Sequence, residues 1–127
     1  MDIIANTLTK VRNALTRKLA KVDVVKSGMV ENILKVMKRE GYIVDFKDSE
    51  ANGFSYTVTL KYVQGKPAIQ GLQRVSRLSL RVYSNAEKIP MVMNNYGVAV
   101  ISTSKGVLTD KEAKALNVGG EVICTIW

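Results

Sequence analysis

The chain has 127 residues, with 19 Lys and Arg residues against 11 Asp and Glu residues and a formal net charge of +8. The single cysteine, Cys124, excludes an intramolecular disulfide. Because the chain has no histidine, a Ser-His or Cys-His nucleophile pair and a His-bearing zinc site are also excluded. No apolar run approaches the roughly 20 residues needed to span a bilayer, while an apolar content of 46% is typical of folded domains. We therefore expect a folded protein without catalytic residues, cofactor, metal or membrane segment, with Cys124 as a small core residue.

The positive charge is concentrated in two parts of the chain. Residues 1–40 hold nine cations and four anions, residues 41–70 hold three of each, and residues 71–127 hold seven cations and four anions. A clustered basic balance is the electrostatic footprint of nucleic-acid binding, whereas small domains also carry such a charge simply for solubility. Charge alone thus favours a polyanionic partner and leaves its kind open.

Residues 2–17 have the apolar periodicity of an amphipathic helix. The residues Ile4, Leu8, Val11 and Leu15 follow one another at helical spacing and predict a single buried stripe. The opposite face is polar and basic, which suits contacts with phosphate and sugar although a plain solvated face has a similar composition. The candidates on this face are Thr9, Lys10, Arg12 and Asn13.

The rest of the first half is predicted to contain a strand, a helix and a hairpin. Gly41 is suited to ending the helix, and the turn of the hairpin falls at residues 51–53. Residues 1–65 are therefore expected to form an α-β-α-β-β domain. The expected elements are a strand at residues 22–25, a helix from the N-cap Ser27 to Glu40, and strands at residues 42–48 and 54–62.

Residues 66–127 are expected to form a second, mostly β domain with one short helix, so the fold class is α+β. The boundary is predicted from the polar stretch 63–67, which contains glycine and proline. The helix is predicted to begin at residues 109–112, because Thr-Asp-Lys-Glu has the capping-box pattern, and to stop at residues 117–120. The other expected elements are strands at residues 69–75, 81–84, 98–101 and 121–127 and a helical turn at residues 90–94.

The segment of residues 102–106, Ser-Thr-Ser-Lys-Gly, is the one most suited to binding. Its hydroxyls, cation and glycine can engage phosphate oxygens, 2′-hydroxyls or base edges, and a Ser/Thr-rich turn that bonds only its own backbone is the equal alternative. Ser102 and Lys105 also match the Ser-x-x-Lys pattern of acyl enzymes. We reject an enzyme of that class because its partner tripeptides, Ser-Asp-Asn and Lys-Thr-Gly, do not occur in the chain.

Five motifs spread over nearly the whole chain carry a family resemblance. They are LTKVRNA at residues 8–14, LKVMKREGYI at 34–43, LRVY at 80–83, ISTSKGVLTDKEA at 101–113, and GGEV at 119–122 with the terminal Trp127. Their sequences and order strongly resemble those of the small-ribosomal-subunit protein eight family. One such motif would be weak support, whereas five in the right order identify the chain as similar to this family.

The resemblance implies a structural RNA-binding protein of the small ribosomal subunit, in bacterial cytoplasm or plastid stroma, with no small-molecule substrate. It implies direct binding to the central domain of the small-subunit rRNA, a part in assembling the platform, and contacts with the neighbouring small-subunit proteins five and twelve. A repressor of messenger RNA that uses the same surface is the alternative. By the resemblance, the RNA-binding residues are Thr9, Lys10, Arg12, Asn13, Tyr83, Ser102, Thr103, Ser104, Lys105, Gly106, Gly119, Gly120 and Glu121.

Two of these positions carry further expectations. Glu121 is expected to accept protons from a base or a 2′-hydroxyl, or to orient Lys105, and an ordinary surface strand residue is the alternative. Family members usually have Ser-Lys-Pro-Gly before the Leu-Arg-Val-Tyr motif, where this chain has Ser-Arg-Leu-Ser at residues 76–79. Without proline and glycine, the sequence does not predict the tight turn there or the placement of Arg77 and Arg81.

Overall fold

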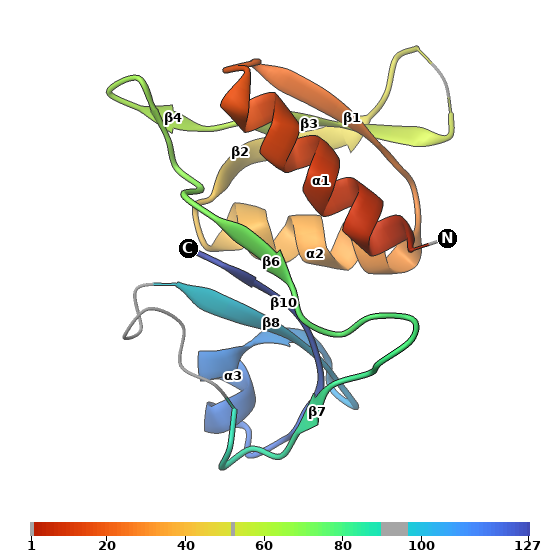
Figure 1. The fold of residues 1–127 in the computed structure, drawn as a ribbon, viewed down its shortest axis with the longest axis vertical. Helices are drawn as coiled ribbons and strands as arrows, with labels where there is room; N and C mark the ends of the chain where they lie inside the picture. The colour runs from red at the N-terminus through yellow and green to blue at the C-terminus, as the bar shows by residue number, and fades with distance from the viewer. Residues whose placement is uncertain (1, 52, 90–96) are drawn as a thin grey trace. The chain divides into compact units, whose positions relative to one another are not determined.

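The computed structural model describes residues 2–51, 53–89 and 97–127, which form two compact units, Met1–Gln70 and Gly71–Trp127 (Figure 1). Each unit is described by itself. The elements of the first unit, in chain order, are α1 (Ile3–Thr16), β1 (Lys21–Val25), α2 (Gly28–Arg39), β2 (Ile43–Asp48), β3 (Ser55–Leu60), β4 (Tyr62–Val63) and β5 (Lys66–Pro67).

The first unit has two layers. Helices α1 and α2 contact each other and pack against an antiparallel sheet with the strand order β1-β3-β2. Val24 and Val58 alternate into the buried side of this sheet and are fully buried, whereas Asp23 and Thr57 lie on the polar side and share a hydrogen bond of 2.7 Å. The predicted α-β-α-β-β order and the hairpin of β2 and β3 are confirmed.

Short local signals set the ends of the helices in this unit. Asp2 accepts a hydrogen bond from the Ala5 N–H at 3.1 Å, and Ser27 accepts one from the Val30 N–H at 3.1 Å. Gly41 has a φ of +81°, a conformation that favours glycine and ends the helical path after α2. The predicted N-cap at Ser27 and the predicted stop at Gly41 are confirmed.

Residues 63–67, the predicted boundary stretch, belong to a small hairpin. Tyr62 pairs with Pro67 and Val63 with Lys66, while Gln64 and Gly65 form the turn with φ values of 54° and 79°. Two successive residues with positive φ are typical of the tight turns that join antiparallel strands. The boundary expected after Gly65 therefore falls inside a regular element of the first unit.

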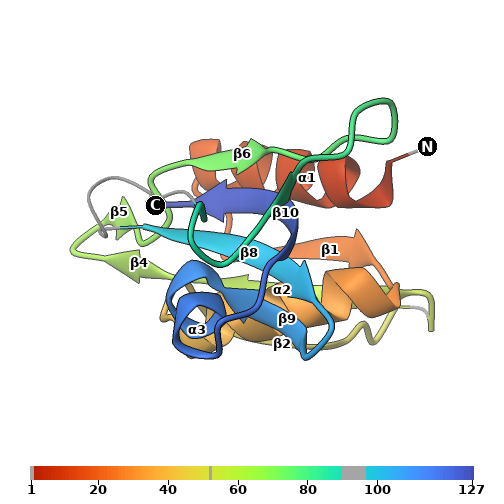
Figure 2. The ribbon, with the colours of Figure 1, turned by 90° about the horizontal axis from the view of Figure 1, so that it is seen from below.

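The second unit is built around its last strand (Figure 2). The sheet has the order β6-β10-β8-β9, and β7 also pairs with β10. Its core cluster contains Ile89, Ala99, Ile101, Ala113 and Val122. The elements of this unit are β6 (Leu72–Arg74), β7 (Tyr83–Ser84), β8 (Val98–Thr103), β9 (Gly106–Thr109), α3 (Asp110–Ala115) and β10 (Gly120–Ile126).

The expected elements of this second half that fall on described residues are present, two of the strands are shorter than predicted, and one strand was not predicted. Helix α3 begins with the predicted capping box, in which Thr109 accepts from the Glu112 N–H at 3.2 Å and Glu112 accepts from the Thr109 N–H at 3.1 Å. The strands predicted at residues 69–75 and 81–84 are shorter than expected, at Leu72–Arg74 and Tyr83–Ser84, and strand β9 was not predicted. The helical turn predicted at residues 90–94 lies outside the described residues. Within the described ranges, no helix is long and apolar enough to cross a membrane.

Candidate nucleic-acid interface

Strand β10 brings three of the predicted site residues into one row. Tyr83 of β7 and Ser102 of β8 are the direct pairing partners of Glu121, one on each side of β10. Directly paired residues share a face of a sheet, and their chain neighbours Ile101 and Val122 belong to the core cluster on the other face. Tyr83 is 70% exposed, so the row is open to solvent at β7.

The segment of residues 102–106 forms the end of the β8–β9 hairpin. Thr103 pairs with Gly106, so Ser104 and Lys105 are the two turn residues, and both are exposed. The Thr103 hydroxyl donates to the Gly106 carbonyl at 2.7 Å and accepts from the Lys105 N–H at 3.1 Å. Thr103 therefore bonds the backbone of its own turn, as the alternative for this segment expected. Among the described residues, the hydroxyls of Ser102 and Ser104 have no such partner, so they remain available to a ligand.

The glycine pair lies against the backbone of the neighbouring strands. A Cβ atom at Gly119 would collide with the Ser84 carbonyl oxygen, and one at Gly120 would collide with the Ser102 carbonyl oxygen. At these two positions the lack of a side chain therefore lets the backbone of the neighbouring strands come close. A side chain at either position would push β7 or β8 away from β10 and disturb the row.

Glu121 is bonded to two residues that the sequence did not single out as its partners. Its Oε2 atom accepts a hydrogen bond from the Ser76 hydroxyl and lies 3.0 Å from Arg81 Nη1. Burial opposes ionisation of the carboxyl, but the hydrogen bonds from Ser76 and Arg81 outweigh it and hold the pKa of Glu121 below its ordinary value. The carboxylate therefore faces Ser76 and Arg81 rather than Lys105, because residues 40 and 45 positions away in sequence fold back onto β10.

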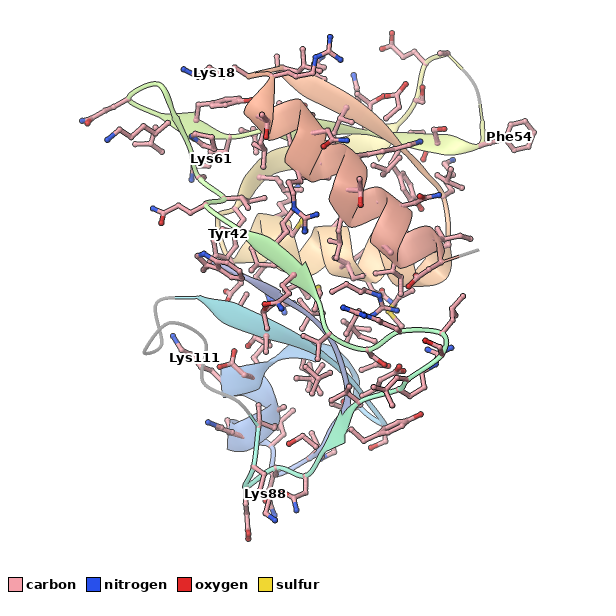
Figure 3. All side chains as sticks on the ribbon, in the orientation of Figure 1. Lys18, Tyr42, Phe54, Lys61, Lys88 and Lys111 are labelled. Atoms are coloured by element: carbon pink, nitrogen blue, oxygen red, sulfur yellow. The ribbon has the colours of Figure 1, made fainter. Side chains whose placement is uncertain are left out.

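The predicted residues of the first helix lie on one exposed face of that helix. Thr9, Lys10, Arg12 and Asn13 are all exposed on α1, away from its buried stripe of Leu8, Val11 and Leu15. Lys18, which follows α1, also extends away from the ribbon (Figure 3). This face of α1 offers positive charge with hydroxyl and amide groups, and a single helix supplies all of it.

Cys124 is fully buried, as expected for a core residue, and burial raises the pKa of its thiol to about 12. The thiolate form that nucleophilic chemistry needs is therefore strongly disfavoured. Within the described residues no group of three His, Cys, Asp or Glu side chains is placed to hold a metal ion.

An α+β protein that presents hydroxyls, a phenol and cations around one strand belongs to the class of candidate nucleic-acid-binding proteins. The family model for ribosomal protein S8 matches residues 2–127, so the chain belongs to the ribosomal protein S8 family. This family consists of structural proteins of the small ribosomal subunit and not of enzymes.

Relatives of the chain occur in bacteria and in a plant plastid lineage. The chain is 50% identical to small ribosomal subunit protein uS8 of Syntrophus aciditrophicus, covering 99% of this chain and 97% of the relative. It is 47% identical to uS8 of Marinobacter nauticus over 99% of this chain and 97% of that protein. It is 45% identical to small ribosomal subunit protein uS8c of Psilotum nudum, over 99% of this chain and 98% of that relative.

Proposed function

We propose that this protein binds small-subunit rRNA directly, in its central domain, and helps to assemble the platform of the subunit. The observation that carries the proposal is the row of Tyr83, Glu121 and Ser102 beside the exposed turn of Ser104 and Lys105. A-form RNA has a deep, narrow major groove that side chains cannot read and a wide, shallow minor groove lined by 2′-hydroxyls and base edges. Short hydroxyl side chains fit that minor groove, and an exposed phenol suits stacking on an unpaired base.

The two surfaces contribute differently to this proposed binding. Lys10 and Arg12 on α1 attract phosphates whatever the base sequence, and thereby supply affinity that depends on salt. Ser102 and Ser104 supply hydrogen bonds that depend on the shape and the edges of the RNA. We therefore assign selectivity to the second unit and general attraction to α1.

The test is a titration with central-domain RNA and with an unrelated RNA duplex of equal length, at several salt concentrations. The double variant Ser102→Ala with Ser104→Ala should weaken binding to the central-domain RNA about tenfold, at about 0.5 to 1.5 kcal/mol for each lost hydrogen bond, and leave the unrelated duplex nearly unchanged. Lys10→Ala should weaken both RNAs alike and reduce the log-log salt slope by about 0.7 to 0.9.

Thr103→Ala is the matched control, because the hydroxyl of Thr103 bonds its own hairpin. Its effect on RNA should follow its effect on hairpin stability. Equal losses for both RNAs in the Ser102 and Ser104 variant would contradict the assignment of selectivity. A parent protein that binds the two RNAs equally weakly would contradict the proposed function itself.

A further inference from the structure

Residues 77–81 form a closed loop between β6 and β7 (Figure 1). The Arg77 N–H donates to the Leu80 carbonyl at 2.8 Å, and the Leu80 N–H donates to the Arg77 carbonyl at 3.1 Å. These reciprocal hydrogen bonds leave Leu78 and Ser79 as a two-residue turn, and neither residue has a positive φ. The tight turn therefore forms here without the proline and glycine that usually occupy this place in the family.

The base of this loop is fixed by a polar cluster of Ser76, Arg81 and Glu121, of which Ser76 is fully buried. Ser76 is fully buried, and its hydroxyl accepts a hydrogen bond from the Val82 N–H at 3.1 Å while donating to Glu121. Arg81 Nη1 lies 3.0 Å from the same carboxylate oxygen. The Glu121 carboxylate thus binds Ser76, directly before the loop, and Arg81, its last residue, and ties both to β10.

The tip of the loop presents apolar and cationic groups to solvent. Leu78 is 57% exposed and Leu80 is 68% exposed, and the neighbouring Arg77 is also exposed. Among the described residues, Arg77 has no ion-pair partner. The charged residues around it in sequence are all basic, because residues 51–86 contain five Lys and Arg residues and no Asp or Glu.

We propose that residues 77–81 are a further RNA-contacting arm and that Glu121 is a positioning residue that holds this arm rather than a contact to RNA. The inference rests on the proposed function. The arm is continuous with the row of Tyr83, Glu121 and Ser102 through the Arg81–Glu121 ion pair, and its charge is complementary to phosphate. The guanidinium of Arg77 reaches phosphates or stacks on an unpaired base, and Leu78 and Leu80 pack against exposed sugar and base surfaces.

The Glu121 assignment also removes an electrostatic difficulty. A free carboxylate beside RNA phosphates is repelled, whereas a carboxylate that is paired with Arg81 and bonded to Ser76 contributes little net negative charge. The depressed pKa of Glu121 agrees with this arrangement, because its charged form is the one that the two partners stabilise. Glu121 therefore acts on RNA through the loop.

Ser76→Ala gives the cleanest test, because a fully buried side chain cannot touch RNA. We expect this variant and Arg77→Ala each to weaken binding to central-domain RNA about tenfold, and Arg77→Ala also to lower the salt slope by about 0.7 to 0.9. Lys66→Ala removes an exposed cation from the β4–β5 hairpin and serves as the matched control, with a smaller loss expected. Unfolding curves measured for every variant separate loss of the fold from loss of the contact.

The positioning role of Glu121 is tested in a protein in which the exposed side chains of the arm are truncated by Arg77→Ala, Leu78→Ala and Leu80→Ala. Glu121→Gln should cost about tenfold in affinity in the parent and almost nothing in this background. An equal loss in both backgrounds would show direct contact of Glu121 with RNA and would overturn the positioning role. Unchanged RNA binding in Arg77→Ala and in the triple variant would overturn the arm and point to a protein partner for the loop. Both results presuppose a parent that prefers central-domain RNA, so they are distinct from failure of the proposed function.

Discussion

The two units of this protein differ in how far apart in sequence their candidate RNA-binding residues lie. On α1 the candidate residues Thr9, Lys10, Arg12 and Asn13 come from one turn and a half of a single helix. In the second unit, the candidate surface is made where β10, the last strand of the chain, meets β7 and β8. A surface of the first kind follows from helical periodicity alone, whereas one of the second kind exists only after the chain has closed its sheet.

This difference has a direct consequence for mutation. A substitution on the exposed face of α1 removes one side chain and leaves the helix in place. A substitution at the centre of the second sheet changes the spacing of three strands, because β10 is bonded to β6, β7 and β8 at once. Stability and RNA binding should therefore change together for substitutions at the centre of the second sheet and separately for substitutions on the exposed face of α1.

The largest effect is expected from Gly120→Val. Because even a Cβ atom at this position would meet the Ser102 carbonyl, the strands β8 and β10 must separate, and we expect a loss of about 1 to 3 kcal/mol in the free energy of unfolding. Binding to central-domain RNA should be lost with it. Denaturant unfolding and RNA titration of the same samples measure both effects.

Gly28→Ala is the matched glycine substitution in the first unit. Gly28 begins α2 and has no atom within 4 Å of the Cβ position, so alanine should stabilise the protein by up to about 1 kcal/mol. RNA binding should stay as in the parent. A Gly120→Val protein as stable as the Gly28→Ala protein would contradict the close packing at β10.

A smaller difference is expected between the N-caps of the two units. Ser27→Ala removes one hydrogen bond, to the Val30 N–H, and should cost about 1 kcal/mol. Thr109→Ala removes the bond to the Glu112 N–H from a residue that is only 1% exposed and is also paired with Val100 in the sheet, so it should cost about 2 kcal/mol. Thermal or denaturant unfolding of the two variants tests the order, and a larger loss in Ser27→Ala would contradict it.

The sequence predicts the local features of both units well, because each of them depends on residues that are close together in the chain. The N-cap Ser27, the stop at Gly41 and the capping box at Thr109 each depend on residues within four positions of one another. Strand β9 escaped prediction because Val107 and Leu108 are too short an apolar run between a glycine turn and a helix cap. Its existence follows from pairing with β8, which periodicity along the chain does not reveal.

The members of the candidate surface were expected from the family resemblance, whereas its geometry was not. The resemblance to the family supplied Tyr83, Ser102 and Glu121, but no spacing in the sequence indicates that they form one row across three strands. The contacts of Glu121 with Ser76 and Arg81 cross 45 and 40 positions of sequence. Such contacts follow from sheet register, which a single sequence specifies only through the complete fold.

The smallest expected effect is on the loss of stability at low pH, for which each unit offers one carboxylate to compare. Asp45 is paired with Lys38 at 2.9 Å, and Glu121 with Arg81 at 3.0 Å. The hydrogen bond from Lys38 holds the pKa of Asp45 below its ordinary value, as Ser76 and Arg81 do for Glu121 against the opposing effect of burial. The side chain of Glu121 is 17% exposed and that of Asp45 is 57% exposed, so solvent screens the pair in the first unit more strongly.

A carboxylate with a lowered pKa in the folded protein stabilises it above its pKa in the unfolded chain, and this stabilisation is lost as the pH falls through the folded pKa. For Glu121 the loss should begin near pH 4.5, its ordinary value, and continue below it. The free energy of unfolding, measured by denaturant from pH 7 to pH 3, should fall less steeply in Glu121→Gln than in the parent, by less than about 1.4 kcal/mol per pH unit. Asp45→Asn should leave the profile closer to that of the parent. If Asp45→Asn flattens the pH profile of the unfolding free energy as much as Glu121→Gln does, the Glu121 carboxylate is no better shielded from solvent than the exposed Asp45. The cluster of Glu121 with Ser76 and Arg81 would then hold the loop of residues 77–81 more weakly than its geometry indicates.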